Sequence, residues 1–167
     1  MFLNKNKSIA CLKALLFIAI TTSLQLQAHI KTITNEDEFV CLIDQKHPTI
    51  VMGSMDACPH CKTITPIFEN HAKKHPSISF IKANGPKTNM HGVTKRESQG
   101  KGDFKIIGYP AFVFIKDKKI VNVVVGGTPE LLEKAIKDFA NDIDSSFKKR
   151  KRDEQNIDQQ SNKKSKK

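Results

Sequence analysis

The chain has 167 residues, enough for one packed domain, and its formal net charge of +11 lies mainly at its two ends. Residues 1–28 contribute +3 and residues 148–167 contribute +6, whereas residues 29–147 contribute only +2 from sixteen basic and fourteen acidic side chains. Because the central segment is nearly neutral, the charge does not indicate a nucleic-acid-binding domain, and we expect no nucleic acid among the partners.

The first 28 residues follow the three-part pattern of a secretory signal peptide. Lys5 and Lys7 give a positive start, an apolar run broken only by Lys13 occupies residues 12–20, and a polar stretch leads to Ala28. The apolar run is shorter than the roughly 20 residues that a transmembrane helix needs, which makes an uncleaved anchor the less favoured alternative. We therefore predict a signal peptide over residues 1–28, cleavage after Ala28 and a periplasmic or secreted protein.

Residues 29–147 alternate strand and helix patterns, which predicts a single α/β domain. Asn35 is expected to cap the first helix, Pro59 to begin the second, and Thr128 to cap the last. The polar stretch before the fourth strand has room for a short helix at residues 88–98. The predicted strands occupy residues 29–33, 49–54, 77–83, 111–115 and 120–125, the last two as a hairpin.

The last segment, residues 148–167, begins with five consecutive basic residues and contains one aliphatic residue and no aromatic one. Because so little apolar surface cannot offset the entropy lost on ordering, we predict a disordered basic tail. Two interpretations of this tail stay open: a solvated terminus, or electrostatic attachment to an anionic membrane or envelope surface.

The motif that carries chemistry is Cys58-Pro59-His60-Cys61, at the point where a predicted strand meets a predicted helix. A thiol at a helix N-terminus faces unpaired backbone N–H groups and the positive end of the helix dipole, and both favour the thiolate. Such positions lower a cysteine pKa to roughly 3.5–7.5. His60 can hold positive charge beside the thiolate. The motif predicts a redox-active disulfide, with Cys58 as the exposed nucleophile and Cys61 as the buried resolving thiol.

A zinc site is the alternative, because C-x-x-C is also half of such a site. The other half is missing from this chain: the six histidines are scattered, and Cys41 is the only further cysteine after residue 28. We predict Cys41 on the buried side of the first helix, and we expect neither a metal nor a cofactor.

Residues 29–147 resemble the thioredoxin family at several separate places. Pro66 lies five residues after Cys61, where thioredoxins carry the proline that kinks the helix, and Gly126 matches the glycine after the last strand. Residues 107–110 followed by an apolar strand are similar to the family's cis-proline loop. The Pro-His dipeptide resembles that of the DsbA family, but the chain has no room for the helical insertion of that family.

The resemblance implies a thioredoxin fold, in which helices flank a central mixed β-sheet. It also implies that the Tyr109–Pro110 peptide bond is cis and lies against the disulfide. In that position the backbone of Tyr109 is available to pair with an extended substrate, so both residues are predicted to bind substrate. The Tyr109 side chain either takes part or only packs.

Two residues depart from the family pattern. Met52 stands where thioredoxins carry a buried acid, and Ala57 stands where a tryptophan usually precedes the first cysteine. Lys82 matches a lysine that lies near the buried acid in thioredoxins. With Met52 in place of that acid, Lys82 either supports a thiolate or reaches solvent.

Together these features predict an exported thiol–disulfide oxidoreductase that acts on cysteine-containing exported proteins and needs a redox partner protein. The Pro-His dipeptide and the export signal favour an oxidant. The alternatives are a thioredoxin-like reductase, a non-catalytic thioredoxin-fold binding module and, third, a metal carrier.

Overall fold

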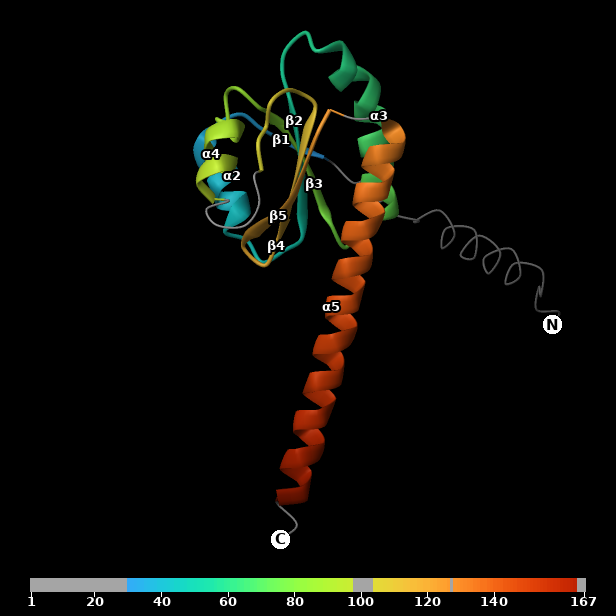
Figure 1. Cartoon of the computed structure of the whole chain (residues 1–167). Helices are drawn as coiled ribbons and strands as arrows, with labels where there is room; N and C mark the ends of the chain where they lie inside the picture. Colours follow the sequence, from blue (N-terminus) through green and yellow to red (C-terminus); the bar gives the residue numbers. More distant parts are fainter. Residues whose placement is uncertain (1–29, 98–103, 127, 165–167) are drawn as a thin grey trace, which may run out of the picture.

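The computed structural model describes residues 30–97, 104–126 and 128–164, so the predicted signal peptide lies outside the described residues. Figure 1 shows a five-stranded sheet between two layers of helices. The strands lie in the order β1 (Lys31–Ile33), β3 (Ser79–Asn84), β2 (Thr49–Ser54), β4 (Ala111–Lys116) and β5 (Lys119–Val125). β1, β3 and β2 are parallel, and β4 and β5 each run antiparallel to the preceding strand in that order. This confirms the predicted α/β architecture.

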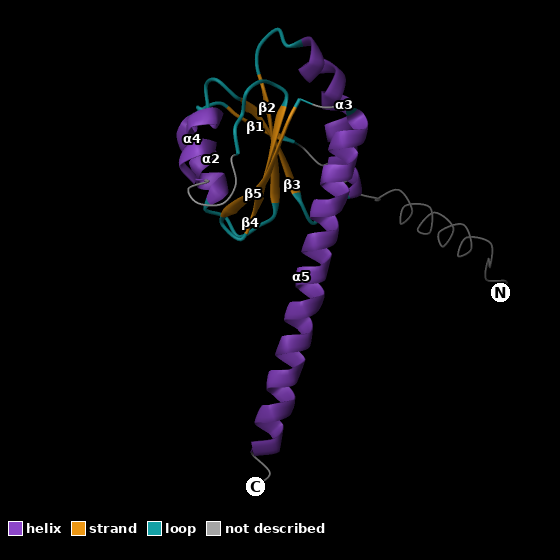
Figure 2. Cartoon of the chain, in the orientation of Figure 1, coloured by secondary structure: helices purple, strands orange, loops and turns teal. Residues whose placement is uncertain are grey.

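The helices cover the two faces of the sheet in pairs, as Figure 2 shows. On one face lie α2 (Glu36–Ile43) and α4 (Met90–Glu97), and on the other lie α3 (Pro59–Lys74) and α5 (Pro129–Lys164). Successive residues of a strand point to opposite faces, so the central strand β2 contributes to two separate cores. Ile50 and Met52 pack in the core under α3 and α5, whereas Val51 packs in the core under α2 and α4.

The first described helix, α2, begins as predicted but presents one residue differently. Asn35 caps it, with its side-chain oxygen accepting a hydrogen bond from the Glu38 backbone N–H at 2.9 Å. The buried face consists of Phe39, Leu42 and Ile43. Cys41 is exposed, so its predicted burial is wrong. Its neighbours in the sequence already fill the apolar stripe, and the helical turn of about 100° per residue carries Cys41 outward.

The short helix α4 is tied to α2 by one carboxylate. Glu36 accepts hydrogen bonds from the Asn89 side chain at 2.9 Å and from Arg96 at 2.6 Å. Hydrogen bonds from Asn89 and Arg96 hold the pKa of Glu36 below its usual value. These contacts place the buried Met90 at the start of α4, next to the middle of the sheet.

The last helix differs most from the prediction, because α5 continues through the basic segment to Lys164. The first half packs on the sheet and the second half projects beyond the domain (Figure 1). Lys, Arg, Glu and Gln are good helix formers, and the packed first half already provides the nucleus that an isolated helix would lack. Side chains 148–153 are all exposed, so this part gains no core contact. None of the described helices is both long and apolar enough to cross a membrane.

A buried histidine lies between the two helices that cover the active-site face. His71 of α3 is only 8% exposed, its Nδ1 has no hydrogen-bond partner among the described residues, and its Nε2 lies 3.9 Å from Glu133 Oε1 of α5. Burial lowers the pKa of His71 from its ordinary value of 6.5, and the charges of Lys74 and His75 act in the same direction. The nearby Glu133 carboxylate opposes them.

We predict that His71 makes the folded protein less stable at acidic pH. Because its pKa is lower in the folded than in the unfolded state, the unfolded chain binds more protons as the pH falls below about 6.5. The urea midpoint of the wild type should therefore fall between pH 7 and pH 5, and the midpoint of His71→Gln should fall less. His47→Gln, at an exposed position, is the matched control. Equal slopes in the wild type and His71→Gln would contradict the assignment.

Candidate active site

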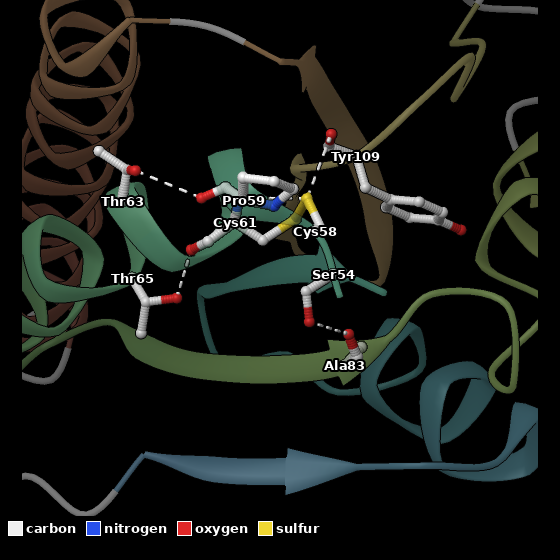
Figure 3. The surroundings of a disulfide bond; sticks show 8 residues. All are labelled: Ser54, Cys58, Pro59, Cys61, Thr63, Thr65, Ala83 and Tyr109. Atoms are coloured by element: carbon white, nitrogen blue, oxygen red, sulfur yellow. Dashed lines mark hydrogen bonds between the residues drawn. A yellow bond between two sulfur atoms is a disulfide. The ribbon is translucent and has the colours of Figure 1, made fainter. Parts of the chain in front are cut away.

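The motif from Cys58 to Cys61 lies at the junction between β2, the central strand of the sheet, and α3. β2 ends at Ser54, a turn follows in which the Cys58 N–H donates to the Met55 carbonyl oxygen at 3.4 Å, and α3 begins at Pro59. Ala57 in this turn has a φ of +61°, in the left-handed region. Such a conformation costs a residue other than glycine about 1 kcal/mol. Cys58 and Cys61 form a disulfide, with their Cα atoms 5.3 Å apart (Figure 3).

The sulfur of Cys58 caps α3. Cys58 has the extended backbone of an N-cap residue, and its Sγ accepts a hydrogen bond from the Cys61 backbone N–H at 3.1 Å. Once the disulfide is reduced, the same N–H faces the Cys58 thiolate, and hydrogen bonds to a charged group are stronger than those to a neutral one. The positive end of the α3 dipole acts in the same direction. The geometry therefore stabilises a thiolate at Cys58.

Exposure does not separate the two cysteines as predicted. In the disulfide form Cys58 is 5% exposed and Cys61 is 4% exposed, so the prediction that Cys58 alone is exposed is wrong for this state. Neighbouring Pro59 and His60 are exposed instead. What distinguishes Cys58 is its position at the cap, because it receives the amide hydrogen bond and Cys61 supplies it.

The second predicted part of the site, the proline loop, lies beside the disulfide. The Tyr109–Pro110 peptide bond is cis, as predicted. The Tyr109 carbonyl oxygen is 3.8 Å from Cys58 Sγ, a contact that becomes a weak hydrogen bond when Cys58 carries a thiol proton (Figure 3). The Pro110 carbonyl oxygen accepts a hydrogen bond from the Gly126 N–H at 2.6 Å, which joins this loop to the end of β5. Substrate binding by Tyr109 and Pro110 stays a prediction.

The Tyr109 side chain points away from the disulfide (Figure 3). It packs in a space that the sequence did not predict. A Cβ atom at Gly85 would overlap the Tyr109 ring, and one at Gly53 would overlap the Met90 sulfur and press on the same ring. The ring is half-buried, and this burial raises the pKa of the Tyr109 hydroxyl. The two glycines therefore make room for the ring, and the ring holds the Tyr109 carbonyl next to Cys58.

The structure shows what surrounds Met52 and Lys82 on the sheet. Met52 is 1% exposed and packs in the same apolar core as Cys58 and Cys61. Lys82 neither supports a thiolate nor simply reaches solvent: its Nζ donates to Glu69 Oε1 of α3 at 2.9 Å. Both of these side chains are partly exposed, so the pair contributes little to stability.

The described residues place no further metal ligands near the cysteine motif. No group of three or more His, Cys, Asp or Glu side chains that could hold a metal ion occurs among them. What the arrangement can do is exchange disulfides.

Because this disulfide can exchange with the thiols of other proteins, the fold and the site together define a thiol–disulfide oxidoreductase with a thioredoxin fold. The thioredoxin family model matches residues 30–138, which include every strand of the sheet. The chain therefore belongs to the thioredoxin family.

The chain is similar to several curated thioredoxins. It is 36% identical to thioredoxin H3 of Arabidopsis thaliana over 73 residues, which span 44% of this chain and 54% of the relative. It is 28% identical to mitochondrial thioredoxin-3 of Saccharomyces cerevisiae over 110 residues, which span 66% of this chain and 80% of the relative. Among solved structures, thioredoxin from Plasmodium falciparum is 27% identical with a TM-score of 0.55, covering 65% of this chain and 98% of that protein.

We predict that Cys61→Ser traps mixed disulfides, because Cys58 then lacks the thiol that normally releases the substrate. Cys58→Ser should trap none at this site. The exposed Cys41 can form mixed disulfides of its own, so both changes belong in a Cys41→Ser background. Trapped protein is measured by non-reducing electrophoresis and mass spectrometry. Equal trapping by the two variants would reject Cys58 as the nucleophile.

We also predict that Gly85→Ala disturbs the site through the Tyr109 ring. The added methyl group overlaps the ring and should cost about 1–3 kcal/mol of stability, as overpacking does. It should also slow insulin reduction, because displacing the ring moves the carbonyl beside Cys58. Gly108→Ala, next to Tyr109 in the proline loop, is the matched control, since a Cβ there meets nothing within 4 Å. Restored stability in Gly85→Ala/Tyr109→Leu would identify overlap with the ring as the cause, whereas an unaltered Gly85→Ala protein would rule out this packing of the ring.

Proposed function

We propose that this thioredoxin-family protein is exported and oxidises cysteine-containing exported proteins. The observation that carries the oxidant direction is the hydrogen bond from the Cys61 N–H to Cys58 Sγ. It stabilises a thiolate, which exists only in the reduced protein, and stabilising the reduced form raises the reduction potential. Met52 favours the same direction, because a carboxylate at that position would repel the thiolate.

The exchange runs in two balanced steps. A substrate thiolate attacks Cys58 Sγ, the Cys58–Cys61 bond breaks, and Cys61 leaves as a thiolate that takes up a proton. A second substrate thiolate then attacks the substrate sulfur of the mixed disulfide and releases the Cys58 thiolate at the start of α3. The substrate has lost two electrons and gained a disulfide, and the protein holds two reduced cysteines. A redox partner protein must then accept these electrons to restore the Cys58–Cys61 bond.

Export is supported by the sequence pattern of residues 1–28 alone. An oxidising compartment suits a disulfide donor, since a reductant there needs its own supply of electrons. For substrate contact we propose the backbone of Tyr109 and Pro110, because the Tyr109 carbonyl already lies beside the reactive sulfur. The basic half of α5 is proposed to attach the protein to an anionic membrane or envelope surface.

The second candidate is a thioredoxin-like reductase. It is favoured by the similarity to proteins named thioredoxin, including a mitochondrial one from yeast. A reductase would have a low potential and would depend on a partner that supplies electrons. A non-catalytic binding module is the third candidate, and it predicts no insulin reduction at all.

We predict a reduction potential clearly above that of thioredoxin, about −270 mV, and nearer that of DsbA, about −120 mV. His60→Gly should lower it by roughly 30 mV or more, a tenfold change in the equilibrium constant, because the change removes the exposed imidazole that lies between the two cysteines of the motif. The measurement is equilibration in glutathione buffers followed by quantification of the reduced Cys58–Cys61 pair. His47→Gly, also exposed but at the opposite end of β2, is the matched control.

A potential near the thioredoxin value that His60→Gly leaves unchanged would overturn the oxidant proposal and favour the reductase. Complete inactivity in insulin reduction would favour the binding module.

A further inference from the structure

The end of the molecule opposite the disulfide carries a pocket of about 320 Å³. β2 begins at Thr49 next to this pocket and ends at Ser54 next to the cysteine motif. β4 likewise runs from beside Pro110 to Lys116, which lines the pocket. A six-residue strand spans about 20 Å, so the pocket and the disulfide lie at opposite ends of the sheet. The residues that line it are Lys46, His47, Pro48, Lys116, Asp117, Ile143, Phe147 and Arg150. We call this end of the molecule the distal pole.

The distal pole combines an apolar surface with several cations and one acid, Asp117. The α5 side chains Ile143 and Phe147 form part of the lining; Ile143 is buried, whereas Phe147 is 44% exposed despite its size. The guanidinium carbon of Arg150 lies 4.6 Å from the centre of the Phe147 ring. Lys116 is anchored in place, because its Nζ donates to Asp142 at 2.6 Å and to Ser146 at 2.7 Å. The exposed Lys46 completes the cationic side. An apolar surface with cations around it suits an amphiphile with an anionic head.

The basic half of α5 continues this surface. Residues 148–152 are five consecutive basic residues, all of them exposed, and they follow Phe147 directly in the helix. Figure 1 shows this half of α5 projecting away from the end of the sheet where α3 begins. The cations of the tail and those of the distal pole therefore face the same side of the molecule, and the disulfide faces the other.

We propose that the distal pole and the adjacent basic half of α5 together bind the surface of a bilayer rich in anionic phospholipid. Phe147 lies at the boundary between head groups and acyl chains, Lys46 and Arg150 bind lipid phosphates, and the Cys58–Cys61 pair faces the aqueous phase. This inference deepens the proposed attachment of the tail and rests on it, but not on the direction of electron transfer. A nucleic acid duplex offers phosphates without an acyl layer, so it would leave the exposed Phe147 ring unused, and a single strand, whose bases can stack on the ring, is included in the test.

The test uses the full-length chain and vesicles of phosphatidylcholine with and without phosphatidylglycerol, at low and at high salt. We expect co-sedimentation only with the anionic vesicles and a strong decrease at high salt. Each cation near an anionic leaflet contributes about a fivefold factor in partitioning, so Lys46→Glu should weaken binding at least fivefold. Phe147→Ser should weaken it at low and at high salt alike. Lys87→Glu is the matched control, since it makes the same charge change at an exposed residue beyond the carboxyl end of β3, on the side of the disulfide.

The outcomes separate this inference from the redox proposal. Lys46→Glu and Phe147→Ser should leave insulin reduction and the reduction potential unchanged, and alkylation of reduced Cys58 should be equally fast on vesicles and in solution. Equal loss of binding in Lys46→Glu and Lys87→Glu would mean that only net charge matters, and would overturn the inference. Retained binding in both Lys46→Glu and Phe147→Ser would overturn it as well, as would tighter binding to a single-stranded oligonucleotide than to anionic vesicles at the same salt.

Discussion

The amide hydrogen of Cys61 points at the sulfur of Cys58, and the arrangement of the site follows from this 3.1 Å hydrogen bond. It forms only if Cys58 has the extended conformation of an N-cap and the helix begins at the very next residue. Pro59 suits that first helical position, because its ring favours the required backbone angle and its missing N–H would have had no partner there. The turn after β2 then brings Cys58 back over the sheet. One short stretch of chain thus provides the nucleophile, its resolving partner and the dipole that acts on both.

Two rigid supports keep this stretch in place. Below it, Met52 belongs to the same apolar core as the disulfide and contributes no charge of its own. Beside it, the ring of Tyr109 occupies the space that Gly85 leaves open and so sets the position of a carbonyl group next to the sulfur. Since the core under α3 and α5 is closely packed, these contacts have few alternative arrangements. The chemistry therefore depends on side chains that never touch a substrate.

The sequence predicted most of what depends on local rules. The strands follow from apolar runs, Asn35 caps its helix as expected, and the spacing of Cys58 and Cys61 indicates their disulfide. What it missed depends on contacts between distant segments. Nothing in the loop at Gly85 points to the ring of Tyr109, and nothing local pairs Lys82 with Glu69. The lack of apolar surface in the tail predicts disorder, but this rule holds for isolated segments. It ignores the packed first half of α5, to which the tail is joined.

The left-handed backbone of Ala57 limits how this site can vary during evolution. Glycine adopts such angles freely and asparagine or aspartate does so at small cost, whereas β-branched residues adopt them only with considerable strain. The backbone angles of the turn thus restrict which residue types can directly precede the nucleophile, and substrate contacts can select only among those types. A change in substrate preference is therefore made more easily at the exposed residues around this position than by placing a β-branched residue at it.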